Sequence, residues 1–355
     1  MPSKMTAAVY RGPRQIEVED VDVPDVGSGD VLIAMKFCGI CGSDVHSYNT
    51  GLYINPGQIM GHEFMGIASK VGSDVEGVSE GSRVTGFSLG VCHHCFWCKR
   101  AEYILCPDLF QYSSGYGLPG GFAEYVLIKN AVIGQSIHIL PDAIDDLSAA
   151  TVEPVAVGVS AAEAAMVKPG DQVVVLGGGM IGNACLQAAK AKGAAKVVLI
   201  EVSPIRLEGA RISGADAVFD ARTGDALQWV KETLGIGRYH FNEGGMADVV
   251  FEAAGSAKTI QQAFEMARSG GTVCFVGLPE GPVPFDTTKI VHKLLRVIGS
   301  LGGDFSQSIR ELASGRIRTR DLITHRFPLE RTPDAFAVQV RSAESIKVMV
   351  QTGTV

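Results

Sequence analysis

The chain has 355 residues, of which 46% are hydrophobic and 19% charged, a composition typical of a folded globular protein of about two domains. Its net charge of −7, with no run of basic residues, argues against nucleic acid or an anionic membrane surface as the main partner. It contains neither the apolar stretch of a signal peptide nor a run of roughly 20 apolar residues, so we expect a cytoplasmic protein that acts on small molecules.

The first half of the chain contains short apolar runs separated by glycine and proline turns. Residues 31–37, 64–71 and 122–128 have the composition of strands. Pairs such as Pro56-Gly57 mark the turns between them. We therefore predict a β-rich, partly closed barrel as the first domain, over residues 1–155.

Potential metal ligands of three chemical kinds are spread through this domain. Cys41 offers a soft sulfur, His62 a borderline imidazole, and Glu63 and Glu153 hard carboxylates. A catalytic zinc takes three protein ligands and keeps one position open. Singly, each residue has an ordinary alternative, because a lone cysteine is often a small core residue and a lone histidine a satisfied polar group. Together they predict an open zinc site.

A second cluster has four cysteines within fifteen residues, in the spacing C-x2-C-x2-C-x7-C. Four thiolates at this density match a closed, tetrahedral, structural zinc site. The alternative is a pair of disulfides, but a chain of this size does not need such cross-links to bury a core. We predict a zinc-binding lobe at about residues 90–108, with these ligands: Cys92, Cys95, Cys98 and Cys106.

From about residue 156 the pattern changes to alternating strands and helices. Strand-like runs at residues 172–176, 197–200, 217–219, 247–251 and 272–276 are separated by helical segments. This alternation predicts a doubly wound parallel sheet over residues 156–295. Residues 296–355 return to a mixed pattern and end in a strand-like run at 346–350. We expect this last segment to fold back on the first domain.

The first strand of this region leads into a glycine fingerprint. Gly177, Gly179 and Gly182 form G-x-G-x-x-G between a strand and a helix, which is the context that confirms a dinucleotide site. Glu201 ends the next strand, 19 residues after Gly182, where a carboxylate binds the adenosine ribose and repels a 2′-phosphate. Arg206 lies close by and could accept a phosphate or be a solvated helix charge. The pattern favours NAD over NADP.

These motifs resemble those of the zinc-dependent medium-chain dehydrogenases of the alcohol dehydrogenase superfamily, over essentially the whole chain. The similarity is greatest to the sorbitol, butanediol and threonine dehydrogenase branch. It implies a Rossmann coenzyme domain, a GroES-like catalytic domain and two zinc ions per chain. The resemblance is carried by Cys41, Ser43, Asp44 and His46, Gly61-His62-Glu63, the four-cysteine lobe, Gly120-Gly121-Phe122-Ala123-Glu124-Tyr125, Glu153-Pro154 and the glycine fingerprint.

The resemblance also implies roles at the catalytic zinc. Cys41 and His62 would bind the metal, and either Glu63 or Glu153 would be the third protein ligand, since branches of the family differ in this. If Glu63 is the ligand, Glu153 would hold the zinc-bound water. Asp44 would orient His62, while Cys38 more closely fits a core position.

A proton relay and a cofactor site follow from the same resemblance. Ser43 would accept the alcohol proton and pass it through the nicotinamide ribose to His46, although a helix N-cap and a polar helix residue are their ordinary alternatives. The predicted NAD contacts are Gly177, Gly179, Met180, Ile181, Gly182, Glu201, Arg206, Ala254, Val276, Gly277, Leu278 and Ser300.

The implied reaction is hydride transfer from a secondary alcohol, diol or polyol to NAD, which converts the alcohol into the corresponding ketone, or the reverse. Ile298-Gly299-Ser300 resembles butanediol and threonine dehydrogenases more than sorbitol dehydrogenases. Threonine oxidation is the alternative substrate. A zinc-free quinone reductase and a non-catalytic NAD-binding relative fit the ligand set less well. Tyr48, Phe87, Tyr112 and Leu278 are candidate pocket walls that could equally be core residues.

The assembly is predicted from edge strands. Residues 272–277 and 297–301 could pair across a two-fold axis and extend the sheet, as in relatives. This predicts a homo-oligomer, either a dimer or a tetramer.

Overall fold

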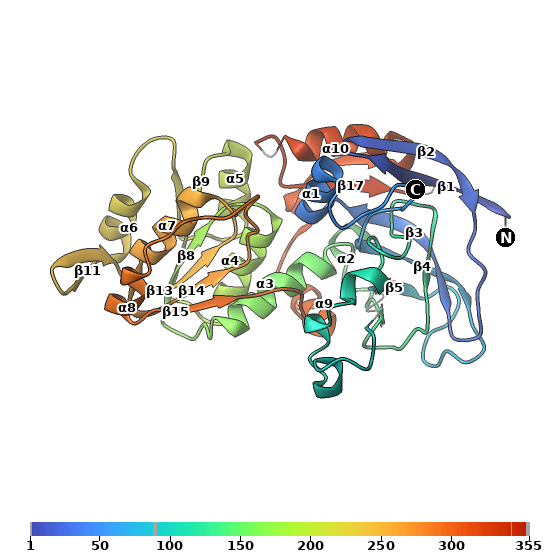
Figure 1. Cartoon of the computed structure of the whole chain (residues 1–355), viewed down its shortest axis with the longest axis horizontal. Helices are drawn as coiled ribbons and strands as arrows, with labels where there is room; N and C mark the ends of the chain where they lie inside the picture. Colours follow the sequence, from blue (N-terminus) through green and yellow to red (C-terminus); the bar gives the residue numbers. More distant parts are fainter. Residues whose placement is uncertain (1, 88–90, 342, 353–355) are drawn as a thin grey trace.

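The computed structural model describes residues 2–87, 91–341 and 343–352. The first residue of the predicted lobe and the extreme ends of the predicted domains lie outside these ranges. The chain forms two lobes, with helices α3 (Val152–Ala164) and α9 (Phe305–Ala313) packed together between them (Figure 1).

One lobe is built on a six-stranded parallel sheet in the order β10-β9-β8-β13-β14-β15. The order reverses at β8, so the carboxyl ends of β8 and β13 form the edge at which doubly wound folds bind ligands. The fold class predicted from the sequence is confirmed. The strands are β8 (Gln172–Leu176), β9 (Lys196–Glu201), β10 (Ala217–Asp220), β13 (Ala247–Glu252), β14 (Ala267–Phe275) and β15 (Arg296–Gly299).

Helices cover both faces of this sheet, which explains why its strands are apolar throughout. Along β8, Val173 and Val175 pack into one core cluster and Val174 and Leu176 into another. The first cluster includes residues of α3 and α4, and the second residues of α6 and α7. The helices of this lobe are α4 (Met180–Ala191), α5 (Pro204–Ile212), α6 (Ala226–Leu234), α7 (Ala257–Met266) and α8 (Thr288–Lys293).

The other lobe is β-rich, with a seven-stranded sheet and a separate antiparallel pair, β1–β2. The last two strands of the chain belong to this sheet, because β17 pairs with β3 and β16 pairs with β17. The strands are β1 (Lys4–Gly12), β2 (Gln15–Asp22), β3 (Val31–Gly39), β4 (Glu63–Val71), β5 (Arg83–Gly86), β6 (Tyr125–Ile128), β7 (Ile137–Ile139), β16 (Ile323–Pro328) and β17 (Lys347–Gln351).

Short helices complete the β-rich lobe, and the cysteine-rich segment contributes only 3-10 turns. The helices are α1 (Gly42–Thr50), α2 (Asp146–Ala149) and α10 (Thr332–Val340), and the turns are η1 (Cys98–Arg100), η2 (Tyr103–Leu105), η3 (Leu109–Tyr112), η4 (Arg320–Leu322) and η5 (Leu329–Arg331).

Two features differ from the sequence-based expectation. Helix α3 begins at Val152, four residues before the predicted start of the alternating region, which places Glu153 in its first turn. An antiparallel hairpin, β11 (Ile236–Tyr239) and β12 (Asn242–Gly245), precedes β13 and was not predicted. Its glycine-rich strands have low β-propensity, so the pairing was not evident from composition.

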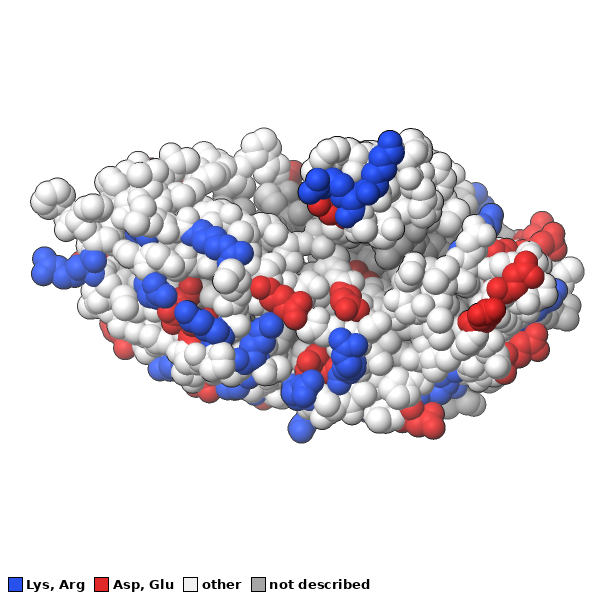
Figure 2. All heavy atoms as spheres, turned by 90° about the horizontal axis from the view of Figure 1, so that it is seen from below, with Lys and Arg blue, Asp and Glu red and all other residues white. Residues whose placement is uncertain are grey.

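The charge distribution on the surface and the length of the helices indicate which macromolecular partners the protein could contact. On the face shown in Figure 2, basic and acidic side chains are interspersed rather than gathered by sign. None of the helices in the described ranges is both long and apolar enough to cross a membrane.

Candidate functional site

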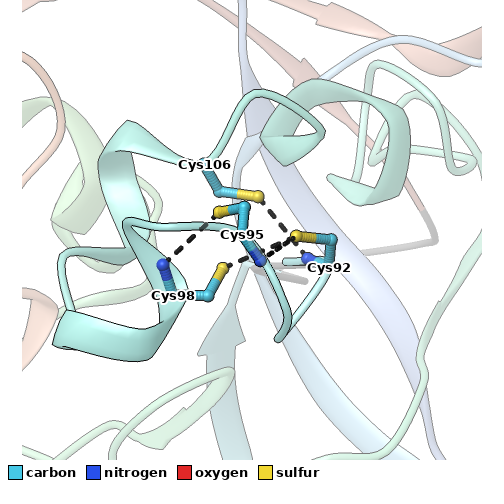
Figure 3. Close-up of side chains that lie close together, drawn as sticks. All are labelled: Cys92, Cys95, Cys98 and Cys106. Atoms are coloured by element: carbon cyan, nitrogen blue, oxygen red, sulfur yellow. Dashed lines mark hydrogen bonds between the residues drawn. The ribbon is translucent and has the colours of Figure 1, made fainter.

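The four clustered cysteines converge. Figure 3 shows the sulfurs of Cys92, Cys95, Cys98 and Cys106 directed toward one another, and all four lie within 4.8 Å of each other. All are free thiols, so the structure contains neither of the disulfides considered as the alternative. Four mutually close sulfurs fit a tetrahedral zinc.

Local turns bring these sulfurs together. Backbone N–H groups of Cys95 and Cys98 donate to the sulfurs of Cys92 and Cys95, at 3.3 and 3.4 Å. Although burial opposes ionisation of Cys92, hydrogen bonds from neighbouring backbone groups lower its pKa to about 7. Burial raises the pKa of Cys98 to about 12, so a thiolate there needs a cation. The donor set therefore suits a metal with no open position.

A second convergent set lies in the β-rich lobe, on segments that are separate in sequence. Ligand atoms of Cys41, His62 and Glu63 lie within 4.8 Å of one another. Cys41 is the N-cap of α1, His62 directly precedes β4, and Glu63 is its first residue. Glu153 is not within this set. One sulfur, one imidazole and one carboxylate match the three-ligand pattern of an open zinc site.

Asp44 links two of these residues from inside α1. Its Oδ2 accepts a hydrogen bond from the backbone N–H of Cys41 at 2.9 Å, and its Oδ1 lies 3.5 Å from Nδ1 of His62. Asp44 is buried and so is His62. With Nδ1 directed at the carboxylate, Nε2 is the nitrogen left for a metal.

Tyr116 is a component of this site that the sequence reasoning missed. Its ring stacks on His62 with centroids 5.1 Å apart, and its hydroxyl donates to Ser43 Oγ at 2.9 Å. Burial raises the pKa of Tyr116, which keeps its hydroxyl a hydrogen-bond donor. Ser43 Oγ also lies 3.4 Å from Nε2 of His62. Ser43 is thus held beside the position expected for the metal.

Glu153 does not belong to the ligand set, but it interacts electrostatically with His62 and Glu63. Burial raises the pKa of Glu153 to about 7, and the Glu63 carboxylate adds to the shift. A carboxyl group poised near neutral pH can exchange a proton with a bound water or substrate.

The glycine fingerprint forms a tight cradle. Gly177 has φ of +102°, a conformation that L side chains rarely adopt. A Cβ on Gly182 would collide with the carbonyl oxygen of Gly177, so the loop can close only with glycine there. Gly179 is the N-cap of α4, and Met180 and Ile181 form its first turn. The free N–H groups of this turn suit a pyrophosphate.

Glu201 lies beneath this loop. Its Oε2 accepts a hydrogen bond from Gly178 N at 2.7 Å, and its Oε1 accepts from the N–H groups of Val202 and Ser203 at 2.6 and 3.0 Å. Arg206 donates from Nε to the carbonyl of Ser345 at 2.9 Å and is half-buried beside the loop. The carboxylate is thus fixed at the end of β9, beside the glycine loop.

The remaining predicted cofactor residues gather at the carboxyl ends of β13 and β14. Glu252, missed in the sequence, organises them, because its Oε1 accepts from the N–H groups of Ala254 and Gly255 at 3.1 and 2.9 Å. Its backbone carbonyl accepts from Val276 and Gly277, both at 2.9 Å. Leu278 is strongly exposed beside them. Ser300 follows the neighbouring strand, β15.

The four residues predicted as possible pocket walls differ in their packing and exposure. Tyr48 packs on Phe336 and donates its hydroxyl to the carbonyl of Arg14 at 3.0 Å, which favours its core alternative. Phe87 packs near Phe305, with ring centroids 6.5 Å apart. Tyr112 and Leu278 are exposed.

Comparison with known families and proteins agrees with both halves of this architecture. Residues 27–140 match the family model "Alcohol dehydrogenase GroES-like domain", and residues 180–316 match "Zinc-binding dehydrogenase". Sorbitol dehydrogenase of Bacillus subtilis (strain 168) is 33% identical over 359 residues, covering 99% of this chain and 98% of that protein. A probable D-xylulose reductase A of Aspergillus fumigatus is 31% identical, covering 96% and 95% of the two chains.

Solved structures are similar over the same length. A putative zinc-binding dehydrogenase of Sinorhizobium meliloti 1021, bound to NADP, has a TM-score of 0.88 and 31% identity, covering 99% of this chain and 100% of that chain. The 2R,3R-butanediol dehydrogenase of Bacillus subtilis has a TM-score of 0.85 and 28% identity, covering 98% and 100%. With the sites described above, these matches show that the chain belongs to the zinc-type medium-chain alcohol and polyol dehydrogenases, which use zinc and a nicotinamide cofactor.

Proposed function

We propose that the protein is an NAD-dependent dehydrogenase of secondary alcohols, diols or polyols, with two zinc ions per chain. The convergence of Cys41, His62 and Glu63 beside Ser43 carries this proposal. In it, these three residues hold the catalytic zinc, and the four-cysteine lobe holds the structural one. Glu153 is assigned to the water or substrate at the open position, because it lies outside the ligand set.

When bound, the catalytic zinc supplies Lewis acidity, which makes loss of the alcohol proton and of hydride feasible near neutral pH. Ser43 takes the alcohol proton. The hydrogen bond that it accepts from Tyr116 orients its oxygen. His46, which lies one turn further along α1, would carry the proton out of the site, and the ribose of a bound nicotinamide cofactor would supply the hydroxyl between the two residues. Histidine suits this exit because an imidazole ring can accept a proton on one nitrogen and release one from the other.

The choice of NAD rests on Glu201. A 2′-phosphate placed at the adenosine ribose would meet a carboxylate fixed by three backbone N–H groups, and Arg206 is engaged with a backbone carbonyl. The similar structure from Sinorhizobium meliloti is bound to NADP, so the preference between NAD⁺ and NADP⁺ is measured directly.

The test is a screen for NADH and NADPH formation with 2,3-butanediol, sorbitol, xylitol, inositol, threonine and primary alcohols. We expect turnover of at least one secondary alcohol, with NAD⁺ preferred, by protein that retains about two zinc ions after dialysis. Preference for NADP⁺ would contradict the Glu201 argument, and activity on primary alcohols alone would contradict the substrate class. Threonine oxidation remains the second candidate, because the sequence at Gly299-Ser300 resembles that of threonine dehydrogenases.

The domain boundaries and the assembly are part of the same proposal. We assign residues 1–155 and the end of the chain, which contains β16 and β17, to the catalytic domain. We assign residues 156–295 together with β15 to the coenzyme domain, because β15 completes its parallel sheet. The strand β15 lies at the edge of the parallel sheet and is available to pair with a second copy. Light scattering that gives a monomer would contradict the proposed dimer or tetramer.

A further inference from the structure

A buried lysine from the end of the chain contacts the catalytic site. Lys347, the first residue of β17, is 3% exposed. Its ammonium group donates to both oxygens of Glu63, at 2.7 and 2.5 Å, and to the carbonyl of Ile40 at 3.0 Å. Glu63 is itself a predicted zinc ligand and Ile40 precedes Cys41, so a single cation contacts one predicted ligand and the residue before another.

The sheet is built to permit this contact. β3 lies between β17 and β4, and Gly39 of β3 pairs with Glu63 on one side and with Met349 on the other. A Cβ on Gly39 would collide with Oε2 of Glu63 and lie 3.3 Å from Cδ of Lys347. Glycine at this position therefore leaves the space across which the two charged groups meet.

The negative charge of Glu63 can be neutralised by two different cations, Lys347 and a metal ion. Glu63 is fully buried and belongs to the set that can hold the metal, yet both of its oxygens accept from Lys347. Within the described ranges, no other lysine or arginine forms an ion pair with Glu63 or Asp44. A carboxylate has about four lone-pair positions, so it can accept from an ammonium group and still bind a metal.

We propose that Lys347 is a positioning residue that shares the Glu63 carboxylate with the catalytic zinc and keeps Glu63 a weak, releasable ligand. This inference rests on the proposed function. Without metal, Lys347 alone neutralises the buried carboxylate. With metal, two cations do so, and they repel each other. Lys347 therefore lowers the affinity for zinc while holding Glu63 in place for it.

Removal of the lysine charge distinguishes this role from a structural one. In Lys347→Met, the metal-free protein contains an unpaired buried carboxylate, which is strongly destabilising, whereas zinc still neutralises it in the loaded protein. We expect the affinity for the catalytic zinc, measured by competition with a chelator, to rise about tenfold or more. The rise in melting temperature on adding zinc should exceed that of the wild type, whereas Lys347→Arg should resemble the wild type.

Lys293 provides a matched control. It is also buried, at 1% exposure, and donates three hydrogen bonds, to the carbonyls of Phe264, Glu265 and Ala267. These lie in the coenzyme domain, away from the zinc ligands. Lys293→Met should lower the melting temperature equally with and without zinc. The structural zinc is common to all variants and cancels in the comparison.

The double variant Glu63→Gln with Lys347→Met tests the shared carboxylate. Without a charge on residue 63, the loss of Lys347 should increase zinc affinity less than it does in the presence of Glu63, because only the repulsion between the two cations is then removed. An unchanged or lower zinc affinity in Lys347→Met would overturn the proposal. So would a Lys347→Met protein that fails to fold even with zinc while the double variant folds. Failure of the proposed function looks different, because the wild type itself would then lack a second zinc or dehydrogenase activity.

Discussion

The two predicted zinc sites differ in how the chain builds them. The cysteine lobe takes all four sulfurs from one short segment of 3-10 turns, within fifteen residues. The site at Cys41, His62 and Glu63 joins the start of a helix to the start of a strand, with side chains from a distant loop and from the last strand. A locally built site holds a fold together, whereas an assembled site can surround its open position with groups that act on a substrate.

The largest expected effect is on activity at the assembled site. Cys41→Ser removes one of the proposed zinc ligands, and the loss of several kcal/mol of transition-state stabilisation should lower kcat/KM by at least about a thousandfold. Steady-state kinetics and zinc analysis check this, with one of two zinc ions lost. The nearby buried Cys38→Ser is the control and should keep both. Equal loss of zinc in the two variants would contradict the assignment.

At the lobe, the expected effect is on stability. Cys98→Ser should release the structural zinc and lower the melting temperature, because a structural site contributes metal-binding free energy to folding. Cys274→Ser alters a buried cysteine in the coenzyme domain and should leave the zinc content unchanged. If Cys98→Ser retained both zinc ions and its thermal stability, the lobe would not be a zinc site.

Substitution of Asp44 tests whether the assembled site depends on residues that contact the predicted ligands but do not bind the metal themselves. Asp44→Asn keeps the shape but weakens the interaction with His62 Nδ1 and the bond from Cys41 N. A loss of about 10–100-fold in metal affinity or kcat is expected. Chelator competition and kinetics measure it. An affinity and a rate equal to those of the wild type would show that His62 is oriented by other means.

A smaller effect is expected at Tyr116. Tyr116→Phe keeps the ring stacked on His62 and removes only the hydrogen bond to Ser43, a bond of about 1 kcal/mol. This predicts a fall of several-fold in kcat with zinc content unchanged. A change in zinc content with kcat preserved would instead place Tyr116 in support of the metal ligand.

The last expected effect is on stability alone, as a pH dependence in the zinc-free protein. The pKa of Glu153 is raised by burial from 4.5 to about 7, so the folded protein holds a proton that the unfolded chain has lost over this range. The free energy of unfolding should therefore fall as pH rises from about 4.5 to 7. Glu153→Gln should remove this slope in urea melts at several pH values. An identical slope in both proteins would assign it to another group.

Much of the fold was predictable because its signals are local. The buried strand β8 and its glycine fingerprint occupy eleven consecutive residues, from Gln172 to Gly182, and the structure places the strand where the sequence predicted it. The hairpin of β11 and β12 was missed because its pairing does not depend on apolar alternation. The start of α3 at Val152 was not predicted from the sequence, although Pro154 is compatible with a first helical turn.

The sequence by itself determined the chemistry available: the soft ligands of the lobe, the mixed ligand set, and the glycines and acid of the nucleotide site. Residue type and short spacing carry that information. Only the tertiary structure brought Lys347 to Glu63 across 284 residues and Tyr116 to Ser43 across 73. No local spacing encodes such contacts, because the register of the sheet, with Gly39 leaving room between two strands, decides which distant charges meet.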